Sequence, residues 1–315
     1  TKCLNSIINQ LDQNKKVFLV DNDSSELCFN KTIKWLNKKY KNKVYKKIFN
    51  KIHKIPKVIL SKKSIFIIKN KNNLGCGLGH NTGYKFALKN NFEFVARIDN
   101  DMIVPKEFFD KILKNFNNKN IQAVSPKILY TKYPRLIWWM GANIGHNLKF
   151  DTHMRNYPHG LKDSKNYIGS VDTDAVAGCA SIMRVTRLKK VGLSDKDFFY
   201  GPEDVELSRR LFTKKGSLIV DRDIKIYHSV TQSFVKLNKR KIYYEYKYRL
   251  LLIKKIGTFM DKFIGYIFSF TKSLMYLVFF FKSKQRNKLG PVFHAWKDFY
   301  LNRFGDYDRK VKPRF

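Results

Sequence analysis

The stretch Val95-Ala96-Arg97-Ile98-Asp99-Asn100-Asp101-Met102-Ile103-Val104 decides how this chain is expected to fold. Apolar residues lead into two carboxylates that are one residue apart, and apolar residues follow them. A buried strand that stops at Asp99 would present Asp99 and Asp101 at its carboxyl end, where ligands bind in open α/β sheets. Side chains at i and i+2 of an extended segment share a face, so the pair suits a divalent cation that also holds phosphates. The competing interpretation is a polar turn after a strand, because Asp and Asn are frequent turn residues.

The composition indicates a folded and strongly basic protein. The chain has 315 residues, of which 43% are hydrophobic, enough for one large α/β domain with an appendage or for two domains. Its 63 Lys and Arg against 25 Asp and Glu give a formal net charge of +38, which favours nucleic acid, anionic lipid or phosphorylated substrates as partners. The basic residues are spread along the whole chain, and a biased genomic composition is a simpler explanation for part of this balance.

Two classes of function lack their sequence motifs. The chain has no zinc-finger spacing, no RNP-like aromatic motif and no basic region with heptads, so nucleic acid is not expected as a partner. The cysteines Cys3, Cys28, Cys76 and Cys179 have no paired spacing. This disfavours a disulfide framework or a zinc site and fits a reducing compartment.

Short apolar runs on the N-terminal side predict further strands. Residues 17–20 and 65–68 are typical of buried strands, and Asp21 would lie at the carboxyl end of the first one. Asp21 suits contact with a nucleotide base or ribose, and equally suits a turn. Residues 37–63 are rich in Lys with interspersed apolar residues, which indicates a basic surface insertion.

A glycine-rich segment at 72–83 precedes a helical run at 84–88. Its glycines would let the backbone approach a ligand, and the helix N-terminus would favour an anion. The spacing matches neither a P-loop nor a dinucleotide-binding fingerprint. Further along, Pro105 fits the first turn of a helix that runs to about Phe116.

The second informative stretch is Phe198-Phe199-Tyr200-Gly201-Pro202-Glu203-Asp204-Val205-Glu206-Leu207. Pro, Glu and Asp are good first-turn residues, so simple helix initiation explains the pattern. The functional interpretation is a general base that points into a cleft from the helix start. His228 follows another apolar segment, and a lone His of this kind is more often structural than a ligand. The polar segment 146–170 is interpreted as a mobile loop.

The C-terminal part has a different character. Residues 236–315 hold 20 Lys or Arg against 5 Asp or Glu, together with many aromatic and aliphatic residues. The uncharged runs in 256–281 are shorter than the about 20 residues that a membrane span needs. Contact with the surface of an anionic membrane and packing against the preceding domain are both compatible with this composition.

The order of these motifs forms a larger pattern over residues 2–256. The residues that carry it are Val20-Asp21-Asn22-Asp23-Ser24, Asn73-Leu74-Gly75 with Gly79, Asn81 and Gly83, Asp99-Asn100-Asp101, Ile137-Trp138 with Gly141, Gly178-Cys179-Ala180, Val191-Gly192-Leu193, Phe198-Phe199, Glu203-Asp204 and His228. This pattern resembles the family 2 glycosyltransferases of GT-A fold, especially the rhamnosyltransferase-like branch. Each motif alone is weak, whereas their shared order and spacing is specific.

The resemblance implies a nucleotide-sugar donor, a divalent cation (Mg²⁺ or Mn²⁺) and inversion at the anomeric carbon. Asp21 would contact the nucleotide base, and Asn73 and Gly75 would line the nucleotide pocket. Asp99 and Asp101 would hold the ribose and the cation that bridges the diphosphate; whether Asp99 contacts the cation or only the ribose stays open.

The resemblance also assigns the proton chemistry. Asp204 would be the base, with Glu203 beside it, and His228 would help to hold the metal or the diphosphate. A carboxylate base is needed because an acceptor hydroxyl is a poor nucleophile. The leaving nucleoside diphosphate needs charge neutralisation, which a cation supplies as a Lewis acid.

The expected architecture is a mixed, mainly parallel α/β sheet flanked by helices, with residues 1–235 as the GT-A catalytic domain and 236–315 as a helical extension. The family's first strand would precede Lys2, the insertion at 37–63 lengthens the usual spacing, and Pro202 and Glu206 replace common Gly and Asp. The expected function is transfer of one sugar to a glycan or lipid-linked acceptor, on the cytoplasmic face of a membrane. The alternative is a catalytically degenerate protein of the same fold that binds glycans or membranes.

Overall fold

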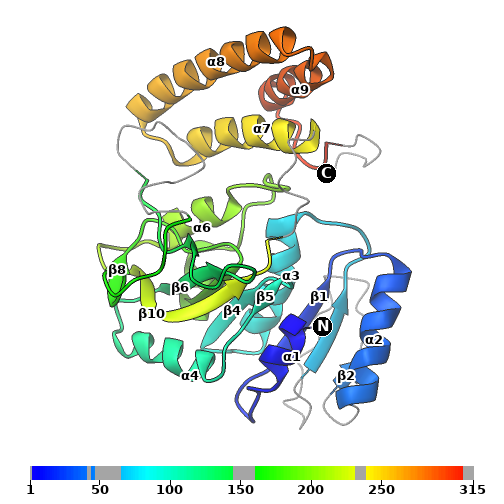
Figure 1. Cartoon of the computed structure of the whole chain (residues 1–315), viewed down its shortest axis with the longest axis vertical. Helices are drawn as coiled ribbons and strands as arrows, with labels where there is room; N and C mark the ends of the chain where they lie inside the picture. Colours follow the sequence, from blue (N-terminus) through cyan, green and yellow to red (C-terminus); the bar gives the residue numbers. More distant parts are fainter. Residues whose placement is uncertain (1, 41–43, 47–64, 145–159, 231–238, 308–315) are drawn as a thin grey trace.

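The computed structural model describes residues 2–40, 44–46, 65–144, 160–230 and 239–307. Its α/β part contains two β-sheets with helices packed on their faces (Figure 1). Three C-terminal helices, α7 to α9, form a layer at one end of the long axis of the molecule (Figure 1). The predicted architecture, a mixed α/β sheet flanked by helices with a helical C-terminal extension, is confirmed.

The smaller sheet is parallel and has the strand order β1-β3-β2. Its strands are β1 (Val17–Asp21), β3 (Ile65–Lys69) and β2 (Val44–Lys46). β3 begins with four consecutive buried β-branched or aromatic residues, which favour a strand covered on both faces. Helices α1 (Lys2–Ile8) and α2 (Glu26–Tyr40) contribute side chains to the hydrophobic cluster around Ile65 and Ile67.

The larger sheet has the order β4-β9-β6-β10-β5, with β7 paired to β6 and β8 paired to β10. Its strands are β4 (Phe94–Ile98), β5 (Met102–Ile103), β6 (Ala123–Tyr130), β7 (Ile137–Trp139), β8 (Ser170–Asp172), β9 (Ala180–Arg184) and β10 (Leu218–His228). Here β6 and β10 are parallel, and the other pairs are antiparallel. The parallel share is therefore smaller than predicted, because β9 inserts between β4 and β6 in the opposite direction.

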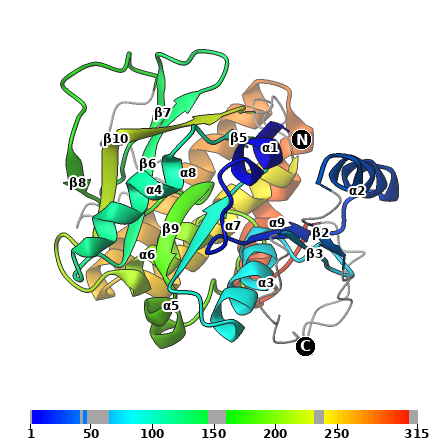
Figure 2. The same cartoon turned by 90° about the horizontal axis from the view of Figure 1, so that it is seen from below.

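Four helices surround the sheets: α3 (Cys76–Lys89), α4 (Phe108–Leu113), α5 (Val185–Val191) and α6 (Glu203–Leu211). Seen from below, α3 lies near the junction of the two sheets (Figure 2), and it contacts both β1 and β4. It begins inside the glycine-rich segment, well before the predicted run at 84–88. The expected helix start at Pro105 is wrong, because Glu107 adopts a left-handed conformation with φ 60° and α4 begins only after it. A 3₁₀ turn, Lys114–Asn117, follows α4.

The C-terminal layer consists of α7 (Lys239–Ile256), α8 (Phe259–Lys282), a 3₁₀ turn (Arg286–Lys288) and α9 (Leu289–Tyr300). α7 is buried along most of its length, and its side chains share one hydrophobic cluster with Phe198 and Val205 of the α/β part. The helical extension therefore packs directly on the loop and helix that carry Glu203 and Asp204.

Some expectations fall outside the described residues. Most of the basic insertion predicted at 37–63, most of the loop predicted at 146–170, and the proposed domain boundary at 235 and 236 belong to this group. They stay predictions.

Candidate active site

The carboxylates of Asp99 and Asp101 lie on a turn at the end of β4. The strand ends at Ile98, and the Met102 N–H donates to the Asp99 carbonyl oxygen at 3.2 Å, which closes the turn. Asp99 Oδ1 lies 3.3 Å from His80 Nε2, and Asp101 Oδ2 lies 3.2 Å from His228 Nε2. The strand end was predicted correctly, and the shared face of the two carboxylates stays a prediction. Because the segment turns instead of staying extended, each carboxylate has its own histidine.

Strand pairing brings Asp101 and His228 together although they are far apart in the sequence. β5 and β10 pair antiparallel, with His228 opposite Met102, and the Ser229 N–H donates to the Asp101 carbonyl oxygen at 2.8 Å. The Trp138 ring packs edge-on against the His228 ring, with centroids 4.5 Å apart. His228, which has no metal-ligand motif around it in the sequence, is thereby fixed beside the carboxylate turn.

The donor atoms at this turn suit a divalent cation only in part. Among the described residues, no group of three His, Cys, Asp or Glu side chains is placed to hold a metal ion. The pair of Asp101 and His228 offers one carboxylate and one imidazole, which suit Mn²⁺ better than Mg²⁺. Cations at phosphate-transferring sites commonly use one or two protein carboxylates and complete their shell with water and substrate phosphates. The two side chains therefore fit a cation that arrives with a diphosphate.

The predicted nucleotide pocket is built from a network of asparagines. The Asn22 side chain donates to Asn73 Oδ1 at 3.1 Å and to the Gly75 carbonyl oxygen at 3.0 Å, and it accepts from Asn70 at 3.0 Å. One carboxylate oxygen of Asp21, Oδ2, is buried and has no hydrogen-bond partner among the described residues. A buried acceptor without a donor is costly, so this atom is a natural place for a ligand N–H.

Gly75 joins the nucleotide pocket to the loop that leads into α6. Its φ is +80°, and a Cβ atom there would lie only 2.2 Å from the Phe199 carbonyl oxygen. That oxygen accepts a hydrogen bond from the Cys76 N–H at 2.8 Å. Only glycine permits this close approach of two backbones. The predicted role of Gly75 in lining the pocket is thus accompanied by a structural role.

Glu203 and Asp204 begin α6, as predicted. Glu203 is 5% exposed, and its Oε2 has no hydrogen-bond partner in the described structure. Asp204 stays partly exposed, and its Oδ1 accepts from the Val205 N–H at 2.9 Å. Burial, and then the neighbouring Asp204 charge, raises the pKa of Glu203 to about 8. Burial also raises the pKa of Asp204, and the positive charge of Arg97 opposes that rise.

Arg97 is a buried residue whose charge acts on both carboxylate pairs. It belongs to β4, is 5% exposed, and donates from Nη2 to the Ala177 carbonyl oxygen at 3.0 Å. A Cβ atom on Gly178 would lie 2.6 Å from Asp204 Oδ2 and 3.3 Å from Arg97 Nη2, so glycine leaves room for both groups to approach. Although burial opposes it, the charges of surrounding groups, including Asp204 and Asp99, raise the pKa of Arg97 above its usual value. Arg97 is therefore a permanent buried cation within the site.

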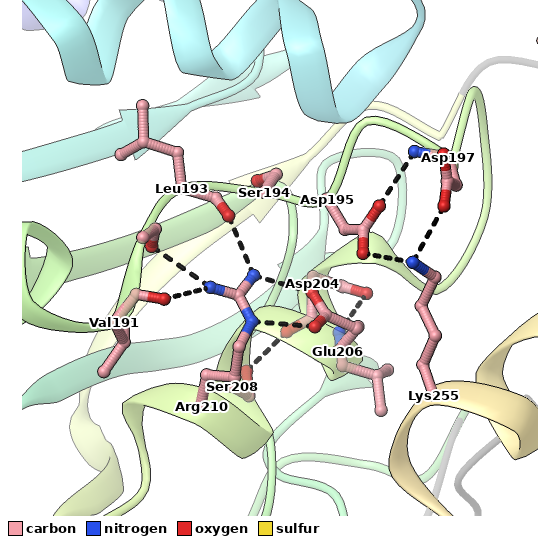
Figure 3. Close-up of polar contacts among 12 residues, drawn as sticks. Val191, Leu193, Ser194, Asp195, Asp197, Asp204, Glu206, Ser208, Arg210 and Lys255 are labelled. Atoms are coloured by element: carbon pink, nitrogen blue, oxygen red, sulfur yellow. Dashed lines mark hydrogen bonds and ion pairs between the residues drawn. The ribbon is translucent and has the colours of Figure 1, made fainter.

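α6 is held in place by a set of polar contacts along its length (Figure 3). The Arg210 guanidinium binds both carboxylate oxygens of Glu206 at 2.7 Å and donates to the carbonyl oxygens of Val191 and Leu193 at 2.8 Å. The Ser208 hydroxyl donates to the Asp204 carbonyl oxygen at 2.6 Å. These contacts fix the helix start that presents the Asp204 side chain.

Three groups at this site have roles that were not predicted from the sequence: Arg97, His80 and the Asn22–Asn70 pair. Arg97 carries a visible signal, because a charged residue interrupts an apolar strand two positions before Asp99. A side chain that must be buried there needs partners of opposite charge. His80 and the asparagines carry no such signal, since polar residues are ordinary both in a glycine-rich segment and directly after a strand.

The family model and the fold define the class of protein as a glycosyltransferase of GT-A type. The sequence model of "Glycosyl transferase family 2" matches residues 1–192, and the chain belongs to that family. No curated protein sequence matches the chain significantly. The resemblance inferred from the motifs is thereby confirmed at the level of the family, and the rhamnosyltransferase-like branch stays a prediction.

Solved structures of similar fold are distant in sequence. Staphylococcus aureus TarS, residues 1–349, in complex with UDP-GlcNAc is 15% identical, with a TM-score of 0.54 over 94% of this chain and 75% of that one. The mannosyltransferase PcManGT from Pyrobaculum calidifontis in complex with GDP-Man and Mn²⁺ is 10% identical, with a TM-score of 0.51 over 95% and 82%. GalNAc-T7 with UDP, GalNAc and Mn²⁺ is 13% identical, with a TM-score of 0.53; the match covers 80% of this chain and 45% of that protein. At these identities the likeness establishes the fold alone.

Proposed function

We propose that this glycosyltransferase moves one sugar, with inversion, from a nucleotide-sugar donor to a hydroxyl of a glycan or lipid-linked acceptor. The observation that carries the proposal is the position of Asp204. It is a carboxylate at a fixed helix start, beside a buried Arg97, in the same site as the Asp99–Asp101 turn. A family 2 chain with these two clusters has separate groups for the leaving diphosphate and for the acceptor proton.

Donor binding would use the groups around the ends of β1 and β4. The free buried oxygen of Asp21 would accept from the nucleotide base, and the loop at Asn73 and Gly75 would contact the nucleoside through its backbone. Asp99 would hold the ribose, and Asp101 with His228 would hold a divalent cation. When bound, that cation would supply charge neutralisation of the diphosphate as a Lewis acid.

Asp204 would act on the acceptor. As the acceptor oxygen forms its new bond to the anomeric carbon, its proton passes to an Asp204 carboxylate oxygen. The bond from the anomeric carbon to the diphosphate oxygen breaks, and its electron pair leaves with the nucleoside diphosphate. The raised pKa of Asp204 improves it as a base, since a carboxylate of higher pKa binds a proton more strongly. Glu203, protonated at neutral pH, would leave Asp204 as the ionised member of the pair.

A donor screen followed by product analysis tests the proposal. We expect one class among UDP-, GDP- and dTDP-linked sugars, including rhamnose, to raise the melting temperature in the presence of Mn²⁺. With that donor and an acceptor, the proton NMR spectrum of the product should show the anomeric configuration opposite to that of the donor. Retained configuration would overturn the inverting mechanism. Binding of a donor without release of nucleoside diphosphate, against a wide acceptor panel, would favour the degenerate binding protein instead.

A further inference from the structure

Helix α8 exposes many large apolar side chains and buries several of its small residues. Gly265, Ser269 and Ser273, its small and hydroxyl-bearing residues, are buried against the rest of the protein. Phe280 is buried on the same side, whereas most of the other large apolar residues of α8 are exposed. In a soluble core helix the large apolar side chains would face inward.

The exposed face of α8 is long and nearly free of polar groups. Its members share exposure above one third of their surface: Phe259, Met260, Phe263, Ile264, Ile267, Phe270, Thr271, Leu274, Met275, Val278, Phe279 and Phe281. Thr271 is the sole hydroxyl among them, and none is charged. Exposed apolar patches of this extent mark an interaction site. α8 is also, among the described residues, a helix long and apolar enough to cross a membrane by length and composition.

Aromatic residues of α9 continue this face. The Phe270 and Trp296 rings lie 6.1 Å apart, and Trp296 stacks on Tyr300, whose side chain is exposed. Trp and Tyr are favoured at the boundary between hydrocarbon and water, because their rings are apolar and carry one polar atom. The α8 face therefore ends in side chains that suit a lipid–water interface.

Cations cluster at the C-terminal end of the apolar face. Lys282, Lys284 and Arg286 are exposed directly after it, and the Arg286 guanidinium lies 4.6 Å from the centre of the Phe281 ring. Basic residues at such a position bind anionic headgroups while their stems contact apolar side chains. A second copy of this chain is a poorer occupant, since two chains of net charge +38 repel each other.

We propose that the α8 face docks the protein on an anionic lipid bilayer, with the helix lying in the plane of the interface. A spanning orientation would detach the small-residue face from α7 and α9, to which it is held by packing and by the Trp296 N–H that donates to the Ser273 hydroxyl at 2.9 Å. α8 is the outermost element at its end of the molecule (Figure 1), so no other described element obstructs this approach.

Docking would also place the acceptor site with respect to the bilayer. Lys255, at the end of α7, binds Asp195 and Asp197 in the loop that precedes α6 (Figure 3), with 2.8 Å to the second carboxylate. The helical layer on the bilayer is thus linked directly to the segment that presents Asp204. This suits an acceptor anchored in the same bilayer, a point that rests on the proposed function.

Vesicle flotation tests the docking surface without requiring enzymatic activity. The wild-type chain should float with vesicles of mixed phosphatidylcholine and phosphatidylglycerol, and should bind more weakly to phosphatidylcholine alone. The triple variant Phe263→Gln, Ile267→Gln, Phe270→Gln should lose binding by about a hundredfold or more, because it removes three apolar anchors. Circular dichroism and melting temperature should match those of the wild type.

A matched control uses exposed apolar residues elsewhere. Leu27, Tyr133 and Ile168 are 65, 52 and 59% exposed, close to the 59, 52 and 55% of Phe263, Ile267 and Phe270. Replacing the first three with Gln should leave flotation unchanged. Equal loss in both triple variants, absence of wild-type flotation, or self-association through α8 in sedimentation without lipid binding would each overturn the proposal. If the wild-type chain floats with vesicles but transfers no sugar, the docking proposal stands and only the proposed function is overturned.

Discussion

Two carboxylate pairs in this site have the same chemical groups but different hydrogen-bond partners. Asp99 and Asp101 lie on a turn, where each contacts one histidine ring. Glu203 and Asp204 lie at a helix start, where Asp204 accepts from a backbone N–H and Glu203 keeps an oxygen without a hydrogen-bond partner in the described structure. The difference arises from the elements that carry them, since strand ends meet other polar loops and α6 packs against a hydrophobic layer.

The surroundings separate the pairs electrostatically. Burial opposes the ionisation of Asp99, but the hydrogen bond from His80 and the nearby positive charges hold its pKa below the usual value. Burial raises the pKa of both Glu203 and Asp204. Groups whose environments push their pKa values apart can perform different tasks at one pH. The first pair suits a permanent charge for a cation and diphosphate, and the second suits proton transfer.

The largest expected effect comes from removing the base. Asp204→Asn keeps the shape and the backbone hydrogen bond of the side chain but cannot accept the acceptor proton. We expect kcat to fall by about 10² to 10⁴, the usual contribution of general base catalysis. Donor affinity, measured by calorimetry, should change by less than about threefold, because the donor contacts lie at the other pair. Asp172→Asn, an exposed carboxylate on β8, is the control and should retain activity.

Substantial turnover by Asp204→Asn would contradict the division of labour. In that event the second pair would keep its proposed role only if the Glu203→Gln variant showed the fall in kcat instead. A loss of donor affinity equal to the loss of turnover would also contradict it, since the two pairs would then act on the same group.

The next effect concerns the first pair. Asp101→Asn removes the charge that contacts His228 and should weaken Mn²⁺-dependent donor binding by about tenfold to a hundredfold, the range for a lost interaction with a charged group. Donor affinity without a divalent cation should be nearly unchanged. Asp110→Asn, at an exposed carboxylate paired with Lys15, is the matched control. An undiminished response to Mn²⁺ in calorimetry would remove Asp101 from the metal site.

The comparison also shows what the sequence could and could not predict. The end of β4 at Ile98, directly before Asp99, and the start of α6 at Glu203 follow from local patterns, because apolar runs, Pro and first-turn carboxylates act within a few residues. The histidine partners do not, since His80 and His228 reach the turn through α3 and through pairing of β10 with β5. Partner choice of this kind depends on tertiary packing.

Two errors have the same origin. The segment from Asp99 to Asp101 was inferred to be extended, but the Met102 N–H closes a turn on Asp99. The helix expected at Pro105 begins later, because Glu107 takes a left-handed conformation first. In both cases the backbone departs from the conformation that the local residue pattern favours. The charge of Arg97 within an apolar strand is visible in the sequence, but its closeness to Asp204 is not, since that depends on Gly178 lying beside both groups.

A smaller effect should appear in stability. Glu203 has a folded pKa of about 8 against an ordinary value of 4.5, so protonation favours the folded state. Its contribution to stability is complete below the unfolded pKa and is lost as the pH rises through the folded pKa. The variant Glu203→Gln, which mimics the protonated form, should therefore melt near the wild-type temperature at pH 5 and above it by a few degrees at pH 9.

The control for this titration is Glu93→Gln, at a carboxylate that is 73% exposed. It should show no comparable trend with pH. A melting-temperature difference between Glu203→Gln and wild type that stays constant from pH 5 to pH 9 would mean that Glu203 does not titrate in this range, and the contrast between the pairs would rest on Asp204 alone.

The smallest effect tests why Asp99 stays ionised. Burial lowers the pKa of His80, which favours the neutral ring, and His80 contacts Asp99 by a hydrogen bond at 3.3 Å. His80→Phe removes that donor and should raise the pKa of Asp99. Because a raised pKa matters least where the pH is highest, donor affinity at pH 7.5 should change by less than about twofold. At pH 5 it should fall, by less than about tenfold, as expected for one hydrogen bond. His80→Gln retains an N–H donor and should restore most of the affinity at pH 5. A loss that is equal at both pH values would show that His80 positions the turn sterically, so that the low pKa of Asp99 would have to come from Arg97 and the other nearby charges.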